Sequence, residues 1–134
     1  MTVAIIDSGG SNLRSVGKAI DRLNKSYVIT DIADEIMKAS FVILPGVGSA
    51  KNVMNQLKKK NLVDVINNLK QPVLGICIGM QILFEYSAEG NTKCLGLIEG
   101  DIQKFDESAD LKVPQMGWNK VTSVSYTHLR AHET

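Results

Sequence analysis

The sequence predicts an α/β fold, in which a doubly wound and mostly parallel sheet carries helices on both faces. Three short, almost continuous apolar runs support this prediction, at residues 3–6, 41–44 and 73–77. They lack the polar and apolar alternation of a half-exposed strand, so both faces of each strand are expected to be covered. Segments with helical periodicity lie between the runs, which implies crossover connections between parallel strands.

The remaining elements follow from spacing and composition. A weaker strand is predicted at residues 27–30, and the order becomes β-α-β-α-β-α-α-β-α. The first helix is indicated by Leu13, Val16, Ile20 and Leu23, whose spacings of three and four place them on one stripe. Further helices are predicted at 34–39, around Val53, Met54 and Leu57, at 62–69, and directly after Cys77, where Met80, Leu83 and Phe84 follow.

The character of the chain changes after Gly90. Glycines there separate apolar segments, and residues 98–105 and 119–124 are predicted to be strands. We expect them to extend the sheet in antiparallel fashion.

Composition limits the class of protein. The 134 residues fit one domain, and a net charge of +1 gives no electrostatic reason to expect nucleic acid or a membrane as a partner. No apolar run approaches the roughly 20 residues that cross a bilayer, and the first residues lack the basic region of a signal peptide. We therefore expect a cytoplasmic protein whose two cysteines, Cys77 and Cys94, remain thiols.

Cys77 is the strongest candidate for a reactive residue. It follows an apolar strand, precedes a helix, and has Gly75 and Gly79 two residues away on either side. This pattern is typical of a nucleophile elbow, a tight strand-to-helix turn in which side chains at the flanking positions would collide. The turn lifts the sulfur to the carboxyl ends of the strands and to a helix N-terminus, which favours thiolate. The alternative is a buried cysteine with two incidental glycines.

A glycine-rich loop follows the strand at residues 41–44. Gly46, Val47 and Gly48 allow the backbone to approach a reacting group and to turn N–H groups toward a developing oxyanion. A second donor is expected from the residue after the nucleophile, Ile78. Taken alone, this segment is most simply an ordinary loop, and residues 46–51 match no phosphate-binding motif.

Two further segments are distinctive. Residues 7–15 follow the first strand and open a helix, with Ser11 or Asn12 placed to cap it. Residues 113–119 contain the only tryptophan, Trp118, which fits a core position and an exposed contact patch equally well. The run of lysines at 58–60 is most simply a solvated helix end.

Together these segments resemble the class I, triad-type glutamine amidotransferases, whose fold is flavodoxin-like. Within that family the similarity is greatest to the glutaminase subunit of imidazole glycerol phosphate synthase, an enzyme of histidine biosynthesis. The resemblance covers residues 1 to about 124, and the segment 113–119 is its most subunit-specific part.

The resemblance implies a set of roles. Cys77 would attack the side-chain amide of L-glutamine, form a glutamyl thioester and release ammonia, without a metal or cofactor. Val47 and Ile78 would donate to the oxyanion, Gly46 and Gly48 would let the loop turn, and Gln81 would hold glutamine. The remaining roles fall to three residues that would face a (β/α)8-barrel cyclase subunit in a heterodimer: Asn12, Trp118 and Asn119. The cyclase would use the ammonia to make imidazole glycerol phosphate and aminoimidazole carboxamide ribotide.

The sequence departs from the family pattern at two places. Gln115 stands where family members usually have His, and no His-x-Glu pair supplies the base and its orienting carboxylate. His128 and His132 do not fit that pair, and a metal site on them is disfavoured. We expect residues 1–124 to be the amidotransferase domain, incomplete at its C-terminus, and residues 125–134 to be a foreign tail. The chain is then a poor glutaminase or none.

Three alternatives remain open. The chain is another cysteine-elbow amidotransferase, a non-catalytic module that docks on the cyclase, or, less favoured, a flavodoxin-like binding domain.

Overall fold

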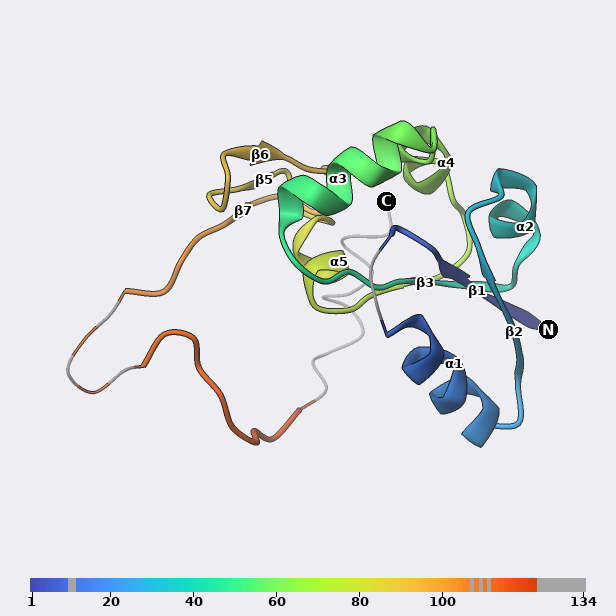
Figure 1. Ribbon diagram of the computed structural model, residues 1–134, viewed down its shortest axis with the longest axis horizontal. Coiled ribbons are helices and arrows are strands. Elements are labelled where there is room, and N and C mark those ends of the chain that lie inside the picture. Colours follow the sequence, from blue (N-terminus) through green and yellow to red (C-terminus); the bar gives the residue numbers. More distant parts are fainter. Residues whose placement is uncertain (10–11, 107, 109, 111, 123–134) are drawn as a thin grey trace. The chain divides into compact units, whose positions relative to one another are not determined.

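A four-stranded parallel sheet lies at the centre of the first part of the chain (Figure 1). The computed structural model describes residues 1–9, 12–106, 108, 110 and 112–122, in two units that comprise residues 1–102 and 103–134. The strands are β1 (Thr2–Ile6), β2 (Ser26–Thr30), β3 (Phe41–Leu44) and β4 (Val73–Gly75), in the order β2-β1-β3-β4. All three pairings are parallel, so the predicted parallel sheet is confirmed.

Five helices of the first unit connect and cover these strands. They are α1 (Leu13–Arg22), α2 (Ala33–Lys38), α3 (Ala50–Lys59), α4 (Val63–Asn67) and α5 (Ile78–Gln81). Figure 1 shows α1 on one side of the sheet and α3 and α4 on the other. The predicted order of strands and helices is confirmed through α5. None of the helices in the described part of the chain has the length and apolar character needed to span a membrane.

The apolar runs are continuous because each strand supplies a core on both faces. Val3, Ile5 and Ile43 are buried toward α1, where Val16 and Ile20 pack on them. The alternate residues of β1 and β3 enter a larger core with residues of α2, α3, α4 and α5, listed here: Ala4, Ile6, Val42, Leu44, Ile36, Val53, Met54, Leu57, Ile66 and Ile78. Each buried Val, Leu, Ile or Met side chain in this list contributes roughly 1.5–3 kcal/mol to folding.

One flank of the sheet has no cover among the described residues. β4 is an edge strand, and Leu74, which lies on the α1 side of the sheet, is 58% exposed. Its neighbour on that face, Phe41, is 40% exposed. An open edge beside exposed apolar side chains is a template for pairing with another chain.

The residues after α5 form a second, smaller sheet. Its strands are β5 (Tyr86–Ser87), β6 (Thr92–Lys93) and β7 (Asp101–Ile102), in the order β6-β5-β7. The predicted antiparallel extension is therefore wrong, since this sheet is separate and β7 pairs with β5 in parallel. Only two residues of the predicted strand 98–105 are extended and paired, and Gly100, at φ +119°, interrupts it. Residues 119–122 form no strand, and 123–124 lie outside the described residues.

Candidate active site

Cys77 occupies a strained bend between β4 and α5. It is the residue before the first turn of α5, at φ 58° and ψ −121°, and its side chain is exposed. The other non-glycine residues with positive φ in the described part of the chain are all asparagines, which tolerate that conformation better. Cysteine has no such tolerance, so the turn around it must hold the backbone in place.

The glycines on either side of Cys77 make this bend possible. A Cβ on Gly75 would lie 2.7 Å from the Cα of Met80 and 2.8 Å from the carbonyl oxygen of Gly79. A Cβ on Gly79 would overlap the carbonyl oxygen of Leu44 at the end of β3. Both positions are closed by backbone atoms, which cannot rotate away as a flexible side chain can. The predicted collision of flanking side chains is thus confirmed.

The glycine loop after β3 packs against the bend. A Cβ on Gly46 would lie 2.9 Å from the backbone nitrogen of Gly79, and the carbonyl oxygen of Gly46 accepts a hydrogen bond of 3.3 Å from the Ile78 N–H. Val47 is exposed, and Gly48 has φ +91° with open space around it. The structure therefore places Gly46 against Ile78 and Gly79, next to Cys77 in the bend, but the Ile78 N–H is engaged by the loop.

α5 is shorter than the sequence predicted. It ends at Gln81, whose backbone N–H donates to the Cys77 carbonyl oxygen at 3.1 Å and whose side chain is half-buried. Two residues later the i to i−4 pattern is lost, because the N–H groups of Leu83 and Phe84 donate to carbonyl oxygens only three residues back and the Glu85 N–H donates to the Gly100 carbonyl oxygen. The predicted helix through Leu83 and Phe84 is wrong for that reason, and α5 provides only one turn of aligned peptide dipoles.

The two cysteines should react very differently. Cys77 is exposed, whereas Cys94 is buried and burial raises the pKa of its thiol, an effect that the charge of Lys58 partly offsets. We predict that iodoacetamide at neutral pH modifies Cys77 at least about 100-fold faster than Cys94, because only exposed thiolate reacts. Peptide mapping by mass spectrometry after timed quenching measures the ratio. In urea, where Cys94 is exposed, its modification should become much faster. If the two cysteines are modified at equal rates in the native protein, and urea does not speed the modification of Cys94, the structure is contradicted.

The residues predicted to face a partner lie in different units. Asn12 precedes α1 at φ 71°, is exposed, and makes no side-chain hydrogen bond to the helix, so its predicted capping contact is absent; Ser11 lies outside the described residues. In the second unit Trp118 is fully exposed, which excludes the core alternative, and Asn119 donates from Nδ2 to Oε1 of Gln115 at 3.3 Å. Met116 and Val121 are exposed beside Trp118 in sequence.

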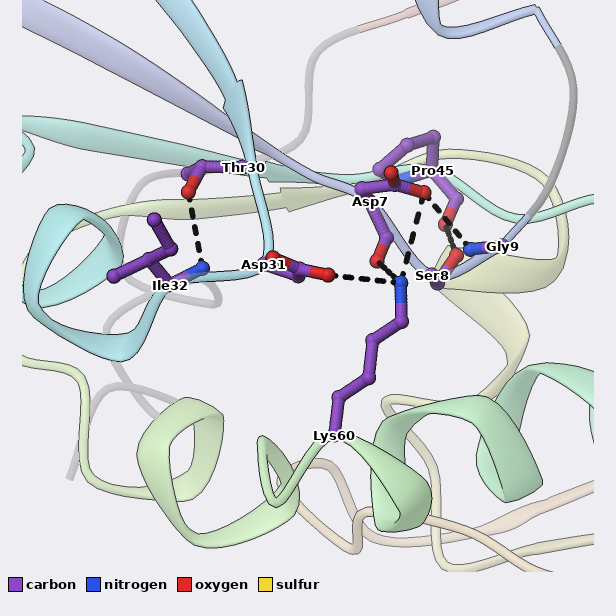
Figure 2. A network of polar contacts seen from close by, with 8 residues as sticks. All are labelled: Asp7, Ser8, Gly9, Thr30, Asp31, Ile32, Pro45 and Lys60. Carbon is purple, nitrogen blue, oxygen red and sulfur yellow. Dashed lines mark hydrogen bonds and ion pairs between the residues drawn. The ribbon is translucent and has the colours of Figure 1, made fainter.

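A polar network beside this site was missed by the sequence analysis (Figure 2). Lys60, which ends α3, is no solvated lysine: its Nζ donates to the Asp7 carbonyl oxygen at 2.9 Å and pairs with Oδ2 of Asp31 at 3.2 Å. Oδ1 of Asp7 is 3.9 Å from the same nitrogen. Ser8 also contacts the glycine loop, since its Oγ donates to the Pro45 carbonyl oxygen at 3.4 Å. Lys60 thereby joins the ends of β1 and β2 to α3.

Removing the Lys60 ammonium should weaken the fold. We predict that Lys60→Ala lowers the free energy of unfolding by about 1 kcal/mol, since one charged hydrogen bond is lost and two aspartates remain near each other, in a partly exposed place. Urea denaturation followed by circular dichroism measures this, with Lys59→Ala as the control, because Lys59 has no such contact among the described residues. If both variants lower the free energy of unfolding equally, the contacts of Lys60 do not contribute specifically to stability.

Comparison with known proteins identifies the family. A sequence profile described as "Glutamine amidotransferase class-I" matches residues 4–131, which is nearly the whole chain. The chain belongs to the class I glutamine amidotransferases. The α/β fold described above is consistent with that family.

Similar proteins narrow the comparison within this amidotransferase family. The chain is 48% identical over 119 residues to "Imidazole glycerol phosphate synthase subunit HisH 2" of Legionella pneumophila strain Paris, covering 89% of this chain and 60% of that protein. It is 48% identical over 123 residues to the HisH subunit of Dehalococcoides mccartyi, covering 89% and 59%. It is 43% identical over 129 residues to the HisH subunit of Xanthomonas oryzae pv. oryzae, covering 96% of this chain and 64% of that protein. The chain thus spans about 60% of the length of these relatives.

The two histidines, which the sequence analysis disfavoured as a catalytic base or a metal site, lie beyond the described part of the amidotransferase chain. His128, His132 and the predicted tail 125–134 are outside the described residues. Within the residues that are described, no group of three His, Cys, Asp or Glu side chains is arranged to hold a metal ion.

Proposed function

We propose that this chain carries the nucleophile half of a glutaminase that serves imidazole glycerol phosphate synthase. The observation that supports it is the exposed thiol of Cys77 on a strained strand-to-helix bend, against which the Gly46–Gly48 loop packs. Relatives with 43–48% identity bear the name of a subunit of that synthase. The substrate is then the side-chain amide of glutamine, and the partner is a cyclase that receives the ammonia.

The Cys77 sulfur would attack the amide carbon, and the carbonyl oxygen would become an oxyanion that needs N–H donors. Ile78 and Val47 are the proposed donors. The Ile78 N–H is hydrogen-bonded to Gly46, so this arrangement requires the loop to turn its carbonyl away. Gly48, at φ +91° with open space around it, gives the loop the freedom to do so. The nitrogen leaves as ammonia once a proton reaches it, and Gln81 would hold the glutamine.

Proton transfer is the weak step of this chain. The sequence contains no His-x-Glu pair, and without a positioned base the thiol loses its proton slowly and ammonia leaves slowly. Losing a general base costs typically about 10²–10⁴ in rate. We therefore propose that residues 1–134 alone turn over glutamine poorly.

Trapping the thioester tests the nucleophile. The 134-residue chain is incubated with glutamine, quenched in acid and examined by intact-mass and peptide mass spectrometry. We expect a glutamyl adduct on Cys77 that hydroxylamine removes and that is absent in Cys77→Ser, since the thioester forms on that sulfur alone. Cys94→Ser is the matched control and should keep the adduct. An adduct on another residue, or one that Cys77→Ser retains, would refute the assignment.

A second candidate function is a docking module for the cyclase that performs no chemistry. The fully exposed Trp118 favours it, with exposed Met116 and Val121 nearby in sequence, because exposed aromatic and apolar side chains mark interaction surfaces. Co-purification with the cyclase that is lost in Trp118→Ala, without any Cys77 adduct, would favour docking over catalysis.

A further inference from the structure

A hollow lies at the carboxyl end of the central sheet, between the loop after β1 and one side of α3. Its volume is about 1110 Å³, and its lining includes Ser8 and Gly9 from the loop and Asn55, Gln56, Lys58 and Lys59 from α3. Cys77 and Gln81 do not line it, although Val47 of the glycine loop does. The hollow is therefore distinct from the proposed nucleophile, while it borders the same loop.

The topology of the sheet makes this a favoured place for a ligand. The chain proceeds from β1 outward to β2 and then crosses back to β3, so the strand order reverses between β1 and β3. Loops that leave adjacent strands in opposite directions open a crevice at their carboxyl ends, where ligands of α/β proteins bind. Ser8 and Gly9 follow β1, and Val47 follows β3, so the hollow occupies this crevice.

The chemistry of the lining favours an anion. No Asp or Glu is among the described residues that line the hollow. The nearby carboxylates, Asp7 and Asp31, are both paired with Lys60, which leaves them less able to neutralise other lysines (Figure 2). Lys58 and Lys59 have no ion pair within the described ranges, and the amides of Asn55 and Gln56 have no hydrogen bond there. Two ammonium groups and two amides remain available as donors.

We propose that this hollow binds a phosphate-bearing small molecule through Lys58, Lys59, Asn55 and Gln56. Two lysines match a dianion better than a single carboxylate, and lysine binds phosphate as a point charge. The volume exceeds that of one phosphate group and leaves room for an organic portion beside the amides. Gly9, at φ +87°, closes one wall by bringing its backbone against Gln56, where a Cβ would lie 3.2 Å from that side chain.

Calorimetric titration of the 134-residue chain with inorganic pyrophosphate tests the site. We expect one saturable site, weakened at least about tenfold in the double variant Lys58→Gln/Lys59→Gln, a change that corresponds to about 1.4 kcal/mol. The matched control is Lys51→Gln/Lys93→Gln, which removes the same charge at exposed positions outside the hollow. We expect it to change the affinity by no more than about twofold. Equal weakening in both double variants would reveal general charge attraction and overturn the proposal.

A second pair of variants tests where pyrophosphate binds, rather than the effect of the protein's net charge. Asn55→Asp puts a carboxylate into the hollow, and Asn67→Asp adds the same charge at the exposed end of α4. Only the first should abolish binding, and loss in both or in neither would contradict the assigned position. Cys77→Ala should bind pyrophosphate as the unchanged chain does, so this result is independent of the proposed glutaminase chemistry.

Discussion

Replacing Gly79 by alanine should abolish the native fold. The added Cβ would overlap the Leu44 carbonyl oxygen and approach the Pro45 carbonyl carbon at 3.1 Å, and both groups belong to backbone at the end of β3. The clash can be relieved only if α5 separates from the sheet, which exposes Ile78 and Ile82, both buried now. Such overpacking together with lost burial is expected to cost about 4 kcal/mol or more, which approaches the whole stability of a small domain.

Urea denaturation followed by circular dichroism measures this effect. Gly117→Ala is the control, because a Cβ there would meet only a side-chain nitrogen of Gln115 at an ordinary 3.5 Å. We expect the control to change the free energy of unfolding by less than about 0.5 kcal/mol. If Gly79→Ala unfolds at the same urea concentration as the unchanged chain, the close approach between α5 and β3 is not present in solution.

Adding a His-x-Glu pair to the 134 residues, on the C-terminal part of a relative, should raise glutamine hydrolysis by about 10²–10⁴-fold. The design joins residues 1–122 of this chain to the part of the Legionella pneumophila relative that follows its matched region, which is absent from the 134 residues. The physical reason is that Cys77 already lies on its bend, while the 134 residues contain no His-x-Glu pair to transfer the proton. Ammonia release from glutamine is measured for the fusion and for the 134-residue chain, with the cyclase subunit of the same organism present.

Two controls separate the effect of the base from that of added stability. Cys77→Ala in the fusion should remove the activity, and replacing the histidine of the His-x-Glu pair that the family resemblance predicts in the added part should return the rate to that of the 134-residue chain. A 134-residue chain that already hydrolyses glutamine as fast as the fusion would refute the proposed role of the base.

The sequence predicted best what local chemistry decides. The bend at Cys77 was predictable because Gly75 and Gly79 avoid steric clashes that arise within a few residues of one turn. The parallel sheet was predictable because residues 3–6 and 41–44 are apolar on both faces. Lys60 was missed because its partner Asp7 is 53 residues away, and a run of three lysines carries no signal of that contact.

The short α5 was missed for the same kind of reason. Its apolar spacing continues to Phe84, but the Glu85 N–H donates to Gly100 and the carbonyl groups of residues 82–84 accept from residues 95–98, all of which lie outside any local window. The hydrogen bond by which the Gly46 carbonyl oxygen occupies the Ile78 N–H was likewise not predicted, since it depends on how β3 and β4 pair. Long-range hydrogen bonds thus decide where local periodicity stops.

The positive φ of Cys77 lowers the stability of the fold at the same residue whose thiol it exposes. Glycine adopts that conformation without penalty, whereas any side chain there costs roughly 1–3 kcal/mol. Selection for thermal stability alone would favour glycine at this position, and the thiol would be lost. A cysteine at such a costly place is what we expect where the sulfur itself has a chemical role.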